Sequence, residues 1–114
     1  MSRIYKILPR AAWEAARSAG RFEGAGVDLA DGYIHFSTAA QAAETARRYF
    51  TGQADMLVLE VEAADLGANL KWEPSRGGDL FPHLYGPLAC DLVRAARDLP
   101  LDAAGVPMLG DLAP

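Results

Sequence analysis

The feature that most limits the fold is an apolar run from Asp55 to Val61. It reads Asp-Met-Leu-Val-Leu-Glu-Val and is the strongest strand pattern in the chain. Strands buried on both faces read as near-continuous apolar runs rather than as alternating ones. The run therefore predicts a central strand of a sheet.

Two further elements are indicated ahead of this strand. Arg3 to Leu8 is short, β-branched and aromatic, and it stops at Pro9, which is typical of a strand. Pro9 suits the start of a helix, and the alanine-rich run from Ala11 to Ala19 is closed by Gly20. Trp13 in this run is expected to anchor the core rather than to stack on a ligand.

The segment from Arg21 to Asp31 shows no clear period. Two glycines and Asp28 mark it as a loop, in which Phe22 and Leu29 are the expected apolar anchors. The Asp-Gly pair at its end indicates a turn. The sequence therefore predicts an irregular connection here.

A strand that carries a histidine runs directly into the next helix. The strand-like run alternates, so Tyr33, His35 and Ser37 are expected to share one face. Ser37 or Thr38 then caps a helix, which has a 3.6-residue period and ends at Gly52. Because backbone N–H groups at a helix start favour an anion or a carbonyl oxygen, this junction is a candidate site.

The densest group of charged and polar aromatic residues lies between Leu70 and Pro87, among a Gly-Gly pair and three prolines. Ala63 to Gly67 is expected to form a helical turn before it. Asn69 to Glu73 predicts a short strand, and Phe81 to Tyr85 a segment that re-enters the sheet. Loops on a rigid scaffold often carry sites, but a long surface turn is the alternative.

The residues after this stretch are ambiguous. The alanines between Asp91 and Asp98 suggest a helix, whereas Leu92, Val93 and the short length allow a strand. The tail from Pro100 is expected to be irregular. Nothing marks a second domain, so residues 1–114 are expected to form a single domain.

Charge and composition argue against some classes of function. The net charge is −4 and the pI about 5.0, whereas a clamp on nucleic-acid phosphates needs a basic face. Cys90 is the lone cysteine, which fits a reducing compartment, and it is expected to be a small buried hydrophobe. No run is apolar enough for a signal peptide or a membrane span. We expect a cytoplasmic protein without nucleic-acid or membrane partners, as a monomer or weak homodimer.

Three blocks together resemble the domain-of-unknown-function 952 family, in order and spacing, over nearly the whole chain. They are Ile4 to Ile7, Asp31 to Thr38 with Gln41, and Trp72-Glu73 followed by Phe81 to Leu88. That family is grouped by fold with the NAD-using ADP-ribosyltransferases and the RNA 2′-phosphotransferases. The resemblance implies an α+β fold, with a split, mostly antiparallel sheet, a few helices, and a cleft between the sheet halves.

The resemblance has three local consequences. It implies a strand from Leu92 to Arg97, against the alanine content. It makes Leu70 to Pro87 one wall of the expected cleft, with the His35 strand and the following helix start as the other wall. Lys6 stands where family members often carry histidine. A lysine can donate to a ribose hydroxyl or a phosphate but cannot accept, so either the role survives in altered form or the position is not catalytic.

The expected catalytic residues are His35, Glu73, His83 and Tyr85. A histidine can carry a proton near neutral pH, and His83 and Tyr85 alternate so that both point to one side. In ADP-ribosyl transfer a glutamate steadies the oxocarbenium-like transition state, which is the role implied for Glu73. The alternatives are structural: a histidine that braces the turn, a salt bridge from Glu73 to Arg76 or Lys71, and hydrogen bonds that tie the loop to the sheet.

The expected ligand contacts are Lys6, Ser37, Thr38, Gln41 and Arg76. Arg76 can clamp a phosphate with its planar fork or be a solvated loop charge, and Ser37 or Thr38 can simply cap the helix. The implied ligand is a small nucleotide-like molecule such as NAD, either bound without chemistry or used to transfer ADP-ribose. No metal is expected, because the histidines lack a paired spacing.

Overall fold

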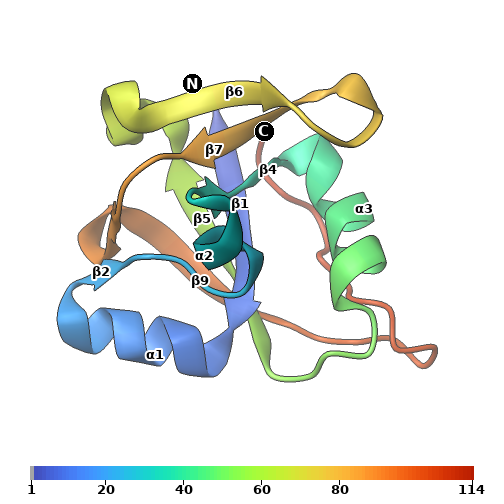
Figure 1. The fold of residues 1–114 in the computed structure, drawn as a ribbon. Coiled ribbons are helices and arrows are strands. Elements are labelled where there is room, and N and C mark those ends of the chain that lie inside the picture. Colours follow the sequence, from blue (N-terminus) through green and yellow to red (C-terminus); the bar gives the residue numbers. More distant parts are fainter. Residues whose placement is uncertain (1) are drawn as a thin grey trace.

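Strand β5 (Met56–Glu62) lies inside a four-stranded sheet in the computed structural model, which describes residues 2–114 (Figure 1). The order in this sheet is β4-β1-β5-β9, and every pair is antiparallel. The apolar run of β5 is covered on both faces, so the predicted central strand is confirmed. The fold is α+β, as expected.

Two smaller antiparallel sheets complete the architecture, with orders β2-β8 and β3-β7-β6. The three-stranded sheet lies at the opposite end of the molecule from helix α1 (Figure 1). The helices and strands are β1 (Arg3–Pro9), α1 (Arg10–Ala19), β2 (Arg21–Phe22), α2 (Val27–Asp31), β3 (Ile34–His35), β4 (Ser37–Thr38), α3 (Ala39–Phe50), β5 (Met56–Glu62), β6 (Leu70–Pro74), β7 (Leu80–Leu84), β8 (Leu88–Ala89) and β9 (Val93–Leu99). Short 3-10 segments span Ala63–Asn69, Arg76–Gly78 and Cys90–Leu92.

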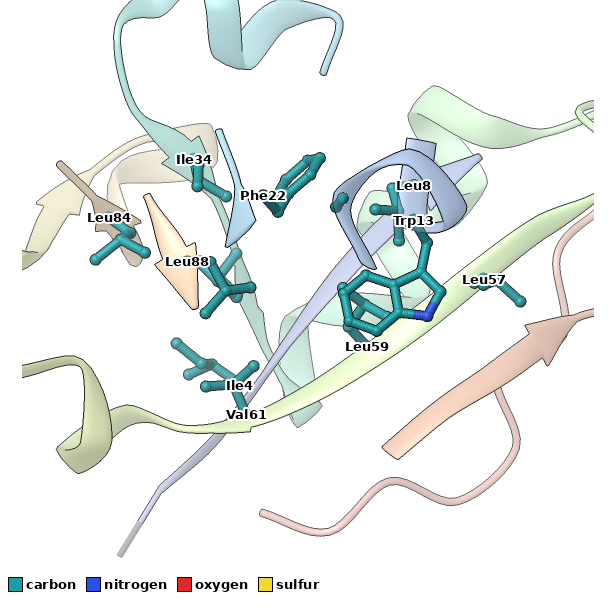
Figure 2. Packing of buried hydrophobic residues seen from close by; sticks show 12 residues of the cluster. Ile4, Leu8, Trp13, Phe22, Ile34, Leu57, Leu59, Val61, Leu84 and Leu88 are labelled. Atoms are coloured by element: carbon teal, nitrogen blue, oxygen red, sulfur yellow. The ribbon is translucent and has the colours of Figure 1, made fainter. Parts of the chain in front are cut away.

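The four-stranded sheet has an apolar cluster on each face. Alternation along β1 sends Ile4 and Leu8 into the first cluster and Tyr5 and Ile7 into the second. Trp13 of α1 packs into the first cluster, which Figure 2 shows, so its predicted role as a core anchor is confirmed. Each such buried side chain stabilises the fold by about 1.5–3 kcal/mol.

The predicted loop after α1 contains regular structure. Phe22 is buried in β2, as expected, but the second proposed anchor was wrong, because Leu29 is 68% exposed. Helix α2 forms the end of the segment, after residues 23–26, which lack regular structure, and it turns Asp28, not Leu29, into the core. Asp28 is buried because several N–H groups and a lysine bind its carboxylate, which a local pattern does not reveal.

The predicted histidine strand is divided between two sheets. β3 pairs with β7, whereas β4 pairs with β1, and the N–H of Phe36 between them donates to the Pro82 carbonyl at 3.0 Å. Ser37 therefore does not share a site with His35. Its hydroxyl donates to Thr45 Oγ1 at 3.0 Å, under helix α3.

Helix α3 begins where the sequence predicts. The Thr38 side chain accepts from the Gln41 N–H, and the Gln41 side chain accepts from the Thr38 N–H, which forms a capping box. Of the two proposed caps, Thr38 is the one that acts. Because these donors are already satisfied, the helix start is less available to an anion.

The second half of the chain largely follows the sequence predictions. The strands expected near Asn69 to Glu73 and Phe81 to Tyr85 are β6 and β7. The strand that the resemblance implied after them is β9, which pairs with β5. In the described part of the chain, no helix is long and apolar enough to cross a membrane.

The tail after β9 has no regular element beyond a single bridge between Leu101 and Pro107. Its later leucines, Leu109 and Leu112, nevertheless pack against the second apolar cluster. The buried hydroxyl of Tyr5 donates to the carbonyl of Ala113. The irregular tail thus covers one face of the central sheet.

Candidate functional site

The two histidines meet on the three-stranded sheet. His35 of β3 is paired in register with His83 of β7, and their ring centroids lie 5.5 Å apart. The stretch from Leu70 to Pro87 and the His35 strand are therefore neighbours in one sheet. They form one continuous face, which corrects the expectation of two opposing walls.

His83 is held by a carboxylate and a tyrosine. Its Nδ1 lies 2.8 Å from Glu73 Oε1, and the Tyr85 hydroxyl donates to the same oxygen at 2.8 Å. The bond from His83 has the largest effect in lowering the pKa of Glu73, and the bond from Tyr85 the next largest. The bond to Glu73 in turn raises the pKa of Tyr85. The alternative of a salt bridge from Glu73 to Arg76 or Lys71 was wrong.

His35 is held by two carboxylates. Its Nδ1 lies 2.6 Å from Asp28 Oδ1, and its Nε2 lies 2.9 Å from Asp31 Oδ2. The His35 backbone N–H also donates to Asp28, at 3.0 Å. Each ring nitrogen of His35 thus faces the oxygen of a different carboxylate.

Lys6 of strand β1 binds the same buried carboxylate, that of Asp28. Its Nζ lies 2.8 Å from Asp28 Oδ2, and Lys6 is 6% exposed. Burial lowers the pKa of Lys6, and the attraction of Asp28 offsets part of this effect. Burial alone would raise the pKa of Asp28, but the bonds from His35 and Lys6 outweigh it and hold the pKa at about 2. Lys6 is therefore a buried partner of Asp28, which in turn holds His35.

This carboxylate should make the fold sensitive to acid. The folded-state pKa of Asp28, about 2, lies below its ordinary value of 3.8. Its contribution to stability is therefore complete above pH 3.8 and is lost as the pH falls from 3.8 towards 2. We expect the urea midpoint of the wild-type protein to fall in this range more steeply than that of the Asp28→Asn variant. Parallel profiles would contradict the prediction.

Tyr33 contacts both histidine groups, which together with it are called the histidine cluster below: His35 with Asp28 and Asp31, and His83 with Glu73 and Tyr85. Its ring centroid lies 4.5 Å from that of His35, 4.2 Å from that of His83 and 5.1 Å from that of Tyr85. Burial raises the pKa of its hydroxyl. Strand alternation predicts Tyr33 on the side of His35, although Tyr33 is not among the expected site residues.

Four expected ligand contacts lie in a separate network. Ser37 and the guanidinium of Arg76 both donate to Thr45, the latter at 3.1 Å. The Arg76 guanidinium also lies 4.9 Å from the Phe81 ring centroid, so Arg76 is not a free loop charge. Gln41 caps helix α3 and donates to the Leu80 carbonyl at 2.8 Å, which ties the helix to β7. Thr38 and Gln41 thus cap the start of helix α3, whereas Ser37 and Arg76 bind Thr45 within the helix.

The cluster contains three residues that were not among the expected site residues. Asp28, Asp31 and Tyr33 belong to it, whereas the sequence predicts Asp28 in a loop and Asp31 in a turn. An open hollow of about 250 Å³ borders it, lined in part by Asp28, Tyr33 and Gly86. In residues 2–114, no group of three or more histidine, cysteine or acidic side chains is placed to hold a metal ion.

The electrostatics of the cluster favour cationic or neutral groups. The carboxylates of Asp28, Asp31 and Glu73 face two histidines and the buried Lys6. Lys71 is paired in register with His83 and is exposed, so it adds one accessible positive charge at the edge of this face. Such a face can bind a positively charged ring and still offer a lysine to an anionic group beside it.

Known proteins resemble the chain closely in sequence and structure. The family described as "Protein of unknown function (DUF952)" matches residues 7–96. The crystal structure of protein CC0527 from Caulobacter crescentus has a TM-score of 0.93 at 59% identity, over 95% of both chains. The solution NMR structure of CC0527 has a TM-score of 0.86 at 60% identity, over 96% of this chain and 95% of that one. No curated protein matches the chain.

Proposed function

The chain belongs to the family described as "Protein of unknown function (DUF952)", and for it we propose transferase chemistry on a nucleotide-like ligand, with NAD as the first candidate. One observation carries the proposal. The two histidines, each bonded through Nδ1 to a carboxylate, lie in register beside Tyr33, whose ring contacts both of them and Tyr85. Such convergence from distant segments of the chain is what a site with several chemical roles needs.

His83 supplies the proton-transfer group. When Nδ1–H donates to Glu73, the lone pair lies on Nε2, which has no hydrogen-bond partner among residues 2–114. Glu73 fixes the tautomer and the ring orientation, as carboxylates do for catalytic histidines. His83 is therefore the base that accepts a proton from an attacking group.

The acidic aromatic face suits the nicotinamide end of NAD. That ring is cationic and flat, so it can stack on the exposed part of Tyr85 beside Glu73. Lys71, at the edge of the same face, is the group available to the diphosphate, since Lys6 and Arg76 are held by protein partners. This assigns the diphosphate contact to a different residue from those expected.

The reaction is a displacement at the ribose C1′. The bond from C1′ to the nicotinamide nitrogen breaks, and nicotinamide leaves with the bonding electrons. A bond from C1′ to the acceptor oxygen forms, and the proton of that oxygen passes to His83 Nε2. Glu73 stabilises the positive charge that develops on the ribose, and electrostatic stabilisation of this type is often the largest catalytic effect. Water is the simplest acceptor.

A second candidate is a binding module without chemistry. The observation that favours it is the engagement of Lys6, Gln41 and Arg76 by protein groups, which leaves fewer contacts for a reacting nucleotide. In that function the same face recognises the ring of a small metabolite, and His83 and Tyr85 act as hydrogen-bonding groups.

Nicotinamide release and ligand binding together test the proposal. We expect NAD to bind in calorimetry and nicotinamide to be released. His83→Asn should slow release about 100-fold, because asparagine can donate to Glu73 but cannot take up the proton. Tyr85→Phe should weaken binding, whereas Tyr49→Phe, on an exposed tyrosine of α3, should change nothing.

The outcomes separate the two candidates. Binding of NAD or ADP-ribose without nicotinamide release, even with protein and RNA acceptors present, would assign the protein to the binding-module class. Absence of binding by both ligands would refute the link to NAD. If His83→Asn and Tyr85→Phe unfold the protein but the remaining folded fraction binds normally, both residues are structural.

A further inference from the structure

A second, unrelated group of residues surrounds a buried carboxylate at the end of β5. Glu62 is 3% exposed, and its Oε2 accepts from the backbone N–H groups of Ser2 at 3.0 Å and Ala64 at 3.3 Å. Its other oxygen, Oε1, is buried and has no hydrogen-bond partner among residues 2–114. A buried acceptor left without a donor is unfavourable, so this oxygen has an unused capacity to bind.

Arg3 forms a long ion pair with this oxygen but no hydrogen bond. Arg3 Nε lies 3.7 Å from Glu62 Oε1, beyond hydrogen-bond distance, while Arg3 Nη1 bonds Glu60 at 3.2 Å. Burial acts to raise the pKa of Glu62, but the bonds from Ala64 and Ser2, the positive charge of the amino terminus and that of Arg3 together outweigh it, and the pKa is lowered. The carboxylate is therefore anionic at neutral pH.

The carboxylate lines an open hollow of about 320 Å³. Trp72, Leu70 and Ala63 supply apolar surface around it, and Trp72 is 42% exposed. Side chains alternate along β6, so Trp72 faces this hollow while Glu73 faces the histidine cluster. The hollow is thus separated from the proposed active site by a single strand.

We propose that this hollow binds the ammonium group of a small primary alkylamine. The Glu62 Oε1 atom lacks a hydrogen-bond donor, and a positively charged N–H group forms the stronger bond to a carboxylate. The alkyl chain lies against Leu70 and the indole of Trp72, whose face also attracts a cation. The site thus recognises a charged head and a short apolar tail.

A titration with n-butylamine tests the proposal. Chemical shifts of the Trp72 indole N–H and the Ala64 backbone N–H report on the two sides of the hollow. We expect saturable shifts with butylamine at pH 7 and none with 1-butanol, which has the same tail but no charge. Glu62→Gln should weaken binding at least tenfold, and Glu14→Gln, the same change at an exposed position of helix α1, should leave it unchanged.

Three results would overturn the proposal. They are equal shifts with butylamine and 1-butanol, an unchanged affinity in Glu62→Gln, and no saturable shift with butylamine. Should Glu62→Gln fail to fold, Trp72→Ala decides, because its side chain is half-exposed and its loss leaves the core intact. A weakened affinity in Trp72→Ala then supports the site, and an unchanged affinity overturns it.

Discussion

Replacement of Asp28 by alanine is expected to lower the free energy of unfolding by about 3–5 kcal/mol. The carboxylate binds Lys6 and the ring and backbone N–H of His35, and it also accepts from the Ala25 N–H. Its removal leaves the buried lysine charge and two backbone donors without a partner. Urea denaturation monitored by tryptophan fluorescence, to which the buried Trp13 contributes, measures the effect.

Asp31→Ala is the matched control. Asp31 also bonds the His35 ring, but its side chain is 47% exposed. Water can replace its contact, so the expected loss is below about 1 kcal/mol. Equal losses in the two variants would show that burial of Asp28 is not the source of its effect. The Lys6→Met variant in the Asp28→Asn background should recover part of the loss, because it removes the unpaired buried charge.

Removal of residues 108–114 is expected to lower the free energy of unfolding by about 2–4 kcal/mol. Leu109 and Leu112, both partly buried, lose their contacts with the second apolar cluster, and full burial of a leucine, the upper limit for each, is worth about 1.5–3 kcal/mol. The hydroxyl of Tyr5, which is 1% exposed, also loses its acceptor at Ala113. Thermal and urea unfolding of the shortened chain measure the loss.

Substitutions within the tail separate packing from chain length. Leu109→Ala with Leu112→Ala should reproduce most of the loss, whereas Asp111→Ala, an exposed position between them, should stay within about 0.5 kcal/mol of the wild type. A full-length double variant as stable as the wild type would show that these leucines do not seal the sheet.

Elements whose helix or strand pattern lies entirely within their own residues were predictable from the sequence. The apolar run of β5 and the capping signal at Thr38 both describe what the structure contains. β9 was different, because its alanines fit a helix and its strand state depends on pairing with β5, about 35 residues earlier in the chain. There the family resemblance supplied what the residues alone left open.

The site was predictable only where its residues act on neighbours along one strand. The shared side of His83 and Tyr85 follows from alternation. Asp28 could not be found in this way, because its main partners lie 22 and 7 residues away, at Lys6 and His35. The alternation argument also failed beyond His35, since it assumes one sheet and the chain changes sheets at Phe36.

The change of sheet at Phe36 has a consequence for how this chain can vary in length. Ile34 and His35 are registered against β7, and Ser37 and Thr38 against β1, with one residue between the pairs. One inserted or deleted residue here would shift the register of one of the two sheets and turn its side chains to the opposite face. Natural variants should therefore carry insertions in exposed turns such as Thr51 to Gln53, and none between positions 34 and 38.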